Sequence, residues 1–168
     1  MPPTKSSLVH QEVILLRASP EQVKAFILTP ERIQDYYPSS IDCGVIDPGR
    51  SFYCRGKSGV SLLELHASES NEDKYVIKVT TALKVKSPFT AQKIRDAAFF
   101  TMLEDWEVEP HKLGSKLTKT WRDVKQQKLK FVPIHLIVKR SAKMESGKLK
   151  LAWDKAAQPQ HVGNTKKA

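Results

Sequence analysis

Residues 18–38, ASPEQVKAFILTPERIQDYYP, contain two helix-start signals in succession. Ser19 suits the capping position, Pro20 suits the first helical position because its missing N–H needs no partner there, and Gln22 stands where a capping-box partner belongs. Apolar side chains then recur at helical spacing on one face: Val23, Phe26 and Ile27. The pattern predicts a short helix from Pro20 onward.

A second helix start follows at Thr29 and Pro30. This helix is expected to run from residue 30 to about residue 36 and to end before Pro38, since a residue that precedes proline is pushed out of the helical region. A strand-like run, residues 9–17, comes directly before both helices. Within that run, residues 13–16 are apolar at successive positions, so both faces of this strand are expected to be covered.

The middle of the chain has the pattern of an antiparallel meander, because short apolar runs alternate with turn residues such as Pro48 and Gly49. Six strands are expected, at residues 41–46, 51–55, 60–67, 75–85, 97–108 and 116–124. Between the fourth and fifth of these, a longer and less regular connection is expected to reach about residue 95. With the first strand the sheet has seven strands, and its apolar face needs a helix laid across it.

The last segment supplies that helix, predicted over residues 133–156. Pro133 stands near its start, apolar residues recur at helical spacing on one face, and lysines with Arg140 occupy the other. At 1.5 Å per residue the helix would be roughly 36 Å long, enough to cross the sheet. Gly147 is the expected point of bending, because glycine weakens a helix interior.

The length of 168 residues predicts a single folded domain over residues 9–157, with a flexible N-terminus at 1–8 and a flexible basic tail at 158–168. No apolar run approaches the ~20 residues that span a bilayer, and the first residues lack the apolar region of a signal peptide. We therefore expect a cytoplasmic protein.

The net charge of +10 belongs to the second half of the chain. Residues 1–83 contain nine basic and ten acidic side chains, whereas residues 84–168 contain nineteen and eight. Such a basic surface attracts anionic lipid headgroups, nucleic acid or the acid group of a ligand. A solvated helix face and tail explain the same charges without any partner, and the sequence leaves both interpretations open.

The order of elements and the strings RASPEQV at 17–23 and LTPERI at 28–33, followed by Pro38, resemble the helix-grip superfamily. This SRPBCC-type superfamily includes START lipid-transfer domains, Bet v 1-like pollen allergens and the polyketide cyclase/dehydrase group. The chain departs from many relatives at Tyr36 and Tyr37, where they place a Trp before the proline. The resemblance implies an α+β fold in which a curved seven-stranded antiparallel sheet grips the C-terminal helix around a cavity for apolar ligands.

Cys43 and Cys54 are too few for a disulfide framework and lack the spacing of metal ligands. If the turn at residues 47–50 is symmetric, the two cysteines lie opposite each other on neighbouring strands. We interpret them as reduced thiols that behave as small hydrophobic side chains, with a redox pair as the alternative.

One carboxylate interrupts an apolar strand face formed by Phe100, Met102, Glu104, Trp106 and Val108. If this face points inward, Glu104 is a buried acid that needs a cation or a donor nearby. Its candidate partners are Arg122 on the next strand and His135 near the start of the last helix. Glu104 would then be a polar anchor for a ligand or, with His135, a weak candidate for general acid–base catalysis. The alternatives are a structural Glu–Arg pair or a Glu that faces solvent.

Motifs for other chemistries are absent from the sequence. Glu64 and His66 have the spacing of a surface pair, no third metal ligand accompanies them, and no phosphate loop, nucleophile elbow or zinc-protease motif occurs. The sequence therefore predicts no metal and no cofactor. Its aromatic residues fall on strands with period-2 alternation, so they are expected in the core, and nucleic acid is an unlikely partner.

Three functions follow, with the first preferred. In the first, the cavity binds or transports a hydrophobic small molecule or lipid, and the basic surface contacts anionic membranes transiently. In the second, the protein is a cyclase/dehydrase-type enzyme that uses the same cavity. In the third, the basic C-terminal surface binds RNA or an acidic partner. The expected ligand-binding residues are Phe26, Tyr75, Ile77, Val79, Phe100, Met102, Glu104, Trp106, Arg122, Ile134, His135 and Val138.

Overall fold

The computed structural model describes residues 6–27 and 40–156. In chain order its elements are β1 (Leu8–Leu16), α1 (Pro20–Ile27), β2 (Asp42–Asp47), β3 (Ser51–Arg55), β4 (Gly59–Leu65), the 3-10 turn η1 (Ala67–Glu69), β5 (Lys74–Leu83), α3 (Ala91–Asp96), β6 (Ala98–His111), β7 (Gly114–Gln126) and α4 (Ile134–Ala156). The second short helix, expected at residues 30–36, lies outside the described residues.

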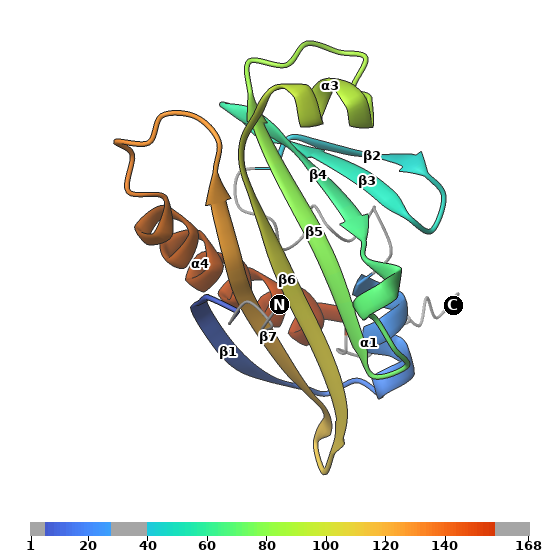
Figure 1. Ribbon diagram of the computed structural model, residues 1–168. Helices are drawn as coiled ribbons and strands as arrows, with labels where there is room; N and C mark the ends of the chain where they lie inside the picture. The colour runs from blue at the N-terminus through green and yellow to red at the C-terminus, as the bar shows by residue number, and fades with distance from the viewer. Residues whose placement is uncertain (1–5, 28–39, 157–168) are drawn as a thin grey trace, which may run out of the picture.

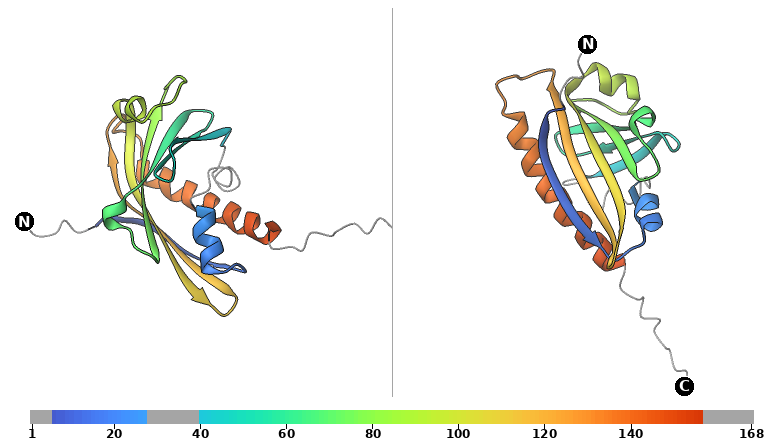
Figure 2. Two further views of the ribbon diagram at one scale, coloured as in Figure 1. Left: turned by 90° about the vertical axis from the view of Figure 1, so that its right-hand side faces the viewer. Right: turned by 60° about the horizontal axis from the view of Figure 1, so that its bottom comes forward.

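The seven strands form one antiparallel sheet in the order β1-β7-β6-β5-β4-β3-β2. β6 and β7 are its longest strands and lie next to each other, with β7 beside the edge strand β1 (Figure 1). The sheet is curved, and α4 passes along its concave side (Figure 2). This arrangement confirms the predicted α+β helix-grip fold with a C-terminal helix laid across the sheet.

The start of α1 has the capping box that the sequence predicts. The backbone N–H of Gln22 donates to Ser19 Oγ at 3.2 Å, and the Ser19 N–H donates to Gln22 Oε1 at 2.9 Å. Val23, Phe26 and Ile27 are buried, and the Phe26 ring packs against that of Trp153 with centroids 4.6 Å apart. The helix therefore ties the end of β1 to the last turns of α4.

α4 begins one residue after its predicted start and runs without interruption through Gly147. Its buried positions include Ile134, Val138, Ala142 and Leu149, at helical spacing against the sheet. A Cβ atom added at Gly147 would meet nothing, because this residue is exposed. No helix in residues 6–27 and 40–156 is both long and apolar enough to cross a membrane.

The prediction that both faces of β1 are covered is wrong. Ile14 and Leu16 point to the concave side and are 6% and 0% exposed, whereas Val13 and Leu15 on the other face are 56% and 41% exposed. β1 is an edge strand, and α4 packs against its concave side. Successive apolar residues therefore do not by themselves establish a two-sided core.

A helix that the sequence analysis did not anticipate, α3, lies in the connection before β6. Thr90 caps it by accepting a hydrogen bond from the Lys93 N–H. Ile94 packs with Val60, Leu62 and Ala82 in a small second core on the convex face of the sheet. With six residues the helix is too short to show an apolar period.

Candidate functional site

A cavity of about 400 Å³ lies between α4 and the concave face of the sheet. The β3–β4 turn, strands β5 to β7 and the first half of α4 supply its lining. The lining residues are Ser40, Cys54, Arg55, Gly56, Lys57, Ser58, Gly59, Ser61, Val79, Thr81, Leu83, Phe99, Phe100, Met102, Glu104, Trp121, Ile137, Val138, Ser141, Ala142 and Glu145.

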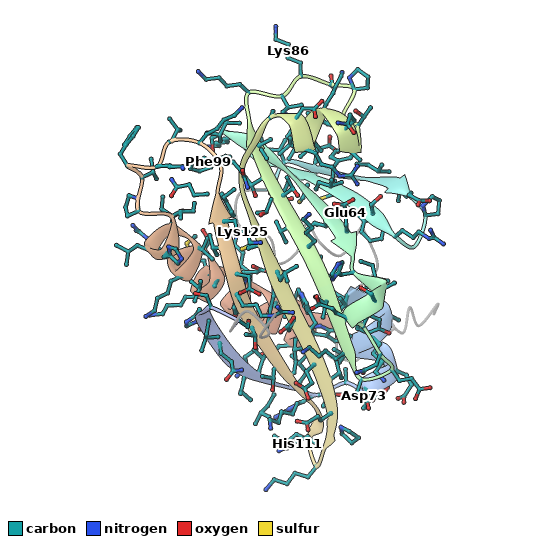
Figure 3. All side chains as sticks on the ribbon, viewed as in Figure 1. Glu64, Asp73, Lys86, Phe99, His111 and Lys125 are labelled. Carbon is teal, nitrogen blue, oxygen red and sulfur yellow. The ribbon has the colours of Figure 1, made fainter. Side chains whose placement is uncertain are left out.

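The walls of the cavity are largely apolar and its two ends differ. Exposed residues, Lys57 and Ser58 on the β3–β4 turn and Ile137 and Ser141 on α4, form the entrance. Phe99 lines the wall near the end of the sheet from which the β7–α4 connection leaves (Figure 3). The opposite, inner end is polar and is closed to bulk solvent.

Three charged side chains meet at this inner end, and we call them the inner cluster: Glu104 on β6, Lys119 on β7 and Glu145 on α4. They are 1%, 0% and 4% exposed. Lys119 Nζ lies 3.3 Å from Glu104 Oε2 and also bonds to Glu145 Oε1. The same Nζ lies 3.7 Å from the ring centroid of Trp106 and 4.7 Å from that of Trp121, within range of cation–π attraction.

The inner cluster contains one more carboxyl group than ammonium groups. Burial raises the pKa of Glu145 to about 8; the Lys119 ammonium opposes the shift and the Glu104 carboxylate adds to it. Burial therefore favours the protonated form of Glu145 near neutral pH, and Lys119 Nζ contacts both carboxyl groups. A titratable proton is thus held at the floor of an apolar cavity.

The strand face that contains Glu104 is buried as expected, but both expected partners of this carboxylate are wrong. The register of β6 and β7 sets Glu104 opposite Trp121 and Leu103 opposite Arg122, so Arg122 points to the convex face. His135 is exposed, because its neighbour Ile134 takes the buried position. Lys119 is the actual partner of Glu104.

On the convex face, Arg122 joins what we call the outer network. Its guanidinium donates to Asp105 at 2.8 Å, to Glu69 at 2.8 Å and to Asp123 at 2.7 Å. Hydrogen bonds to Asp105 raise the pKa of Arg122 above its ordinary value. Arg122 is therefore held in a structural network away from the cavity.

Of the expected ligand-binding residues, five line the cavity: Val79, Phe100, Met102, Glu104 and Val138. Among the others, Phe26, Ile77, Trp106 and Ile134 are buried in the main core, and Tyr75 is partly buried against it. These five lie outside the lining of this cavity, while Arg122 and His135 lie elsewhere, as described above.

The sequence analysis missed Lys119 and Glu145, although both had a signal. On β7 the buried positions alternate as Ser115, Leu117, Lys119 and Trp121, which places the lysine inward. On α4, Glu145 falls on the same face as Ala142 and Leu149. Lys119 and Glu145 each interrupt an apolar face, so the sequence alone could have suggested that they form a pair.

Cys43 and Cys54 lie directly opposite each other on β2 and β3, as the turn symmetry predicted. Both are free thiols, and Cys54 lines the cavity. His66 is partly exposed and lies 3.4 Å from Glu69, while Glu64 pairs with Arg95. Among residues 6–27 and 40–156, no group of three or more His, Cys, Asp or Glu residues is arranged to hold a metal ion.

Comparisons with known proteins bear on the fold. No family model matches the chain, and no curated protein matches it in sequence. A START superfamily protein from Mycobacterium smegmatis is similar in structure, with a TM-score of 0.59 and 14% identity over 88% of this chain and 97% of the other. A conserved protein from Geobacillus kaustophilus has a TM-score of 0.61 and 12% identity over 87% and 95%.

The Bet v 1 protein Ara h 8.0201 is similar as well, with a TM-score of 0.57 and 10% identity over 87% of this chain and 97% of the other. At these identities the likeness establishes the fold alone. The chain has the START/Bet v 1-like helix-grip fold, and its function must be argued from its own cavity.

Proposed function

We propose that this protein binds and carries a hydrophobic small molecule or lipid in the cavity between the sheet and α4. The observation that supports this function best is the apolar cavity of about 400 Å³, a volume typical of small-molecule sites. START/Bet v 1-like proteins generally bind hydrophobic ligands. Binding energy would come from burial of ligand surface, at about 25 cal/mol per Å² of apolar area.

A neutral dye that fluoresces in apolar surroundings, N-phenyl-naphthylamine, tests this proposal. Ala142 is buried on α4 and lines the cavity, so Ala142→Phe fills the space and should weaken dye binding about tenfold or more. Met144→Phe, on the exposed side of the same helix, is the matched control and should bind the dye as the wild type does. Absence of dye binding, or equal binding by Ala142→Phe, contradicts the proposal.

The proposed carrier would meet anionic membranes through its basic, apolar β7–α4 loop, residues 128–131. Lys128 and Lys130 alternate there with Leu129 and Phe131, which are 45% and 85% exposed. The Lys128 N–H donates to the carbonyl oxygen of Phe99, a cavity residue, so the loop is anchored beside the cavity. Lysines flanking exposed apolar side chains suit a bilayer interface with anionic headgroups.

Vesicle sedimentation tests the membrane contact. Vesicles containing phosphatidylglycerol should bind the wild type, and binding should weaken with salt and with Phe131→Ala. Leu113→Ala removes an exposed apolar residue from the distant β6–β7 turn and serves as the control. Equal binding to purely zwitterionic vesicles would contradict an electrostatic contact. The cytoplasmic location expected from the sequence remains a prediction.

A second candidate, the cyclase/dehydrase-type enzyme, is favoured by the inner cluster. Glu145, with a pKa of about 8, has a proton to donate near neutral pH, which suits a general acid. Glu145→Gln should then abolish turnover while leaving dye binding intact. The RNA-binding alternative has little support from the strand aromatics, since Phe99, Phe100, Trp106 and Trp121 are buried and cannot stack on bases, whereas Phe131 is exposed.

A further inference from the structure

At the floor of the cavity, one buried carboxylate oxygen lacks a hydrogen-bond donor among the described residues. Within the part of the chain that the structure describes, Glu104 Oε1 has no hydrogen-bond partner. Its other oxygen, Oε2, accepts from Trp106 Nε1 at 3.2 Å and lies 3.3 Å from Lys119 Nζ. Glu104 is 1% exposed, so bulk water does not reach it. An unsatisfied buried acceptor is costly, which favours a ligand that brings a donor.

The charges at the floor of the cavity also favour a ligand that brings a donor or a positive charge. Among the described residues, Glu104 and Glu145 face a single ammonium, that of Lys119, and all three are at least nine-tenths buried. A buried excess of negative charge must be balanced by a bound proton or by a second cation. A carboxylate or phosphate entering here would add to the excess, although the surface of this half of the chain is basic.

We propose that the cavity takes an apolar molecule whose inner end donates a hydrogen bond to Glu104, with an ammonium preferred to a hydroxyl and a carboxylate disfavoured. This inference rests on the proposed ligand-binding function and specifies its ligand class. Both donor types satisfy Oε1. The ammonium is preferred because its hydrogen bond is charge-assisted and because it balances the second carboxylate.

Binding of an ammonium has a proton signature that binding of a hydroxyl lacks. When the ligand supplies the second positive charge, Glu145 can ionise, and its proton passes to the solvent; no covalent bond forms or breaks. The charged groups that face Glu145 are Lys119 from β7, Glu104 from β6 and Glu12 from β1. Glu12, whose carboxylate lies 2.9 Å from His10, is a further acidic group near Glu145 and supplies no positive charge to the inner cluster.

Three probes of equal chain length, decylamine, decanol and decanoate, decide the matter by displacement of N-phenyl-naphthylamine from wild-type protein. We expect decylamine to bind about tenfold more tightly than decanol, and decanoate to bind most weakly. Calorimetry in buffers of different ionisation enthalpy should show proton release near pH 7 with decylamine and none with decanol. Equal affinities, or tightest binding of decanoate, would overturn the ligand class while leaving the cavity function intact.

Substitutions on β6 then test which residue produces the preference for decylamine. Glu104→Gln keeps an acceptor but removes the charge, so decylamine should lose its tenfold advantage over decanol. Glu109→Gln, exposed on the same strand, is the matched control and should keep the wild-type ranking. If Glu104→Gln does not fold, Glu145→Gln replaces it and should abolish proton release. A wild-type ranking in a folded Glu104→Gln protein would overturn the assignment. If no probe and no dye binds, the proposed function itself fails.

Discussion

The two faces of β6 and β7 each hold a cluster of charges, and Glu104 and Asp105, which are adjacent on β6, belong to different clusters. Glu104 and Lys119 point to the concave face and are 1% and 0% exposed. Asp105 and Arg122 point to the convex face, where Arg122 bonds to three carboxylates and reaches solvent. Residues of the same chemistry thus form a closed cluster at a cavity on one side and a solvent-facing network on the other.

The difference shows that burial decides what an ion pair does. On the convex face, Arg122 donates to three carboxylates, and although Asp105 Oδ1 also lacks a partner among the described residues, none of these residues lines the cavity. On the concave face, one cation serves two carboxylates beside an apolar space, and one oxygen of Glu104 has no partner among the described residues. An incompletely satisfied buried cluster is the stronger candidate for chemistry or recognition.

The largest effect is expected when the central cation of the inner cluster is removed. Lys119→Met leaves two buried carboxylates without a cation and should lower the free energy of unfolding by about 3–5 kcal/mol. Denaturant unfolding measures the loss. Lys116→Met, a partly exposed lysine on the same strand paired with Glu109, should change stability little. A Lys119→Met protein within about 1 kcal/mol of wild type would show that the inner cluster is not structurally important.

The pH dependence of stability should follow Glu145. Its pKa is 4.5 in the unfolded chain and about 8 in the fold, so between these values the native state holds a proton that the unfolded state has lost. Raising the pH therefore favours unfolding: this contribution is complete below about pH 4.5, falls by on the order of 5 kcal/mol toward pH 8, and is flat above.

Glu145→Gln removes the titrating group and isolates that contribution. Denaturant unfolding of both proteins between pH 5 and pH 9 should show a wild-type curve that falls relative to the variant as the pH rises. Groups distant from the inner cluster titrate equally in the two proteins and cancel in the difference. Parallel curves, or a difference that grows in favour of the wild type, would contradict the protonation of Glu145 in the fold.

A smaller effect is expected on the convex face. Arg122→Met should cost about 1 kcal/mol, since Glu69 and Asp123 are then solvated and Lys74 still lies 3.6 Å from Asp105. This loss should shrink in high salt, unlike that of Lys119→Met, because exposed pairs are screened. A salt-independent loss as large as that of Lys119→Met would erase the contrast between the two faces.

The smallest effect tests the same contrast on apolar residues of β1. Val13→Ala, on the exposed face, should change stability by less than about 0.5 kcal/mol, whereas Ile14→Ala on the concave face should cost about 2–4 kcal/mol. Thermal and denaturant unfolding of the pair measure both values. Similar losses for the two variants would mean that the outer face of β1 is covered in solution.

The local signals in the sequence were sufficient for the fold. The Ser19–Gln22 capping box, the turn before Ser51 and the apolar face of α4 are each encoded within a few residues. The site was predicted only in part: Glu104 was placed correctly, but Arg122 was assigned to it although its neighbour Trp121 occupies the inward position. The alternation of buried positions along β7 indicates the correct partner of Glu104, because it places Lys119 inward.

By itself, the sequence determined the number and order of the strands, the caps and the helix that crosses the sheet, because turn chemistry and hydrophobic periodicity act over short distances. Only the tertiary structure decided that Glu104, Lys119 and Glu145 meet, since strand register and the position of α4 bring together side chains from three separate elements. It also decided that a cavity remains beside them. Charge, burial and empty volume depend on how whole surfaces pack, and no local pattern specifies that packing.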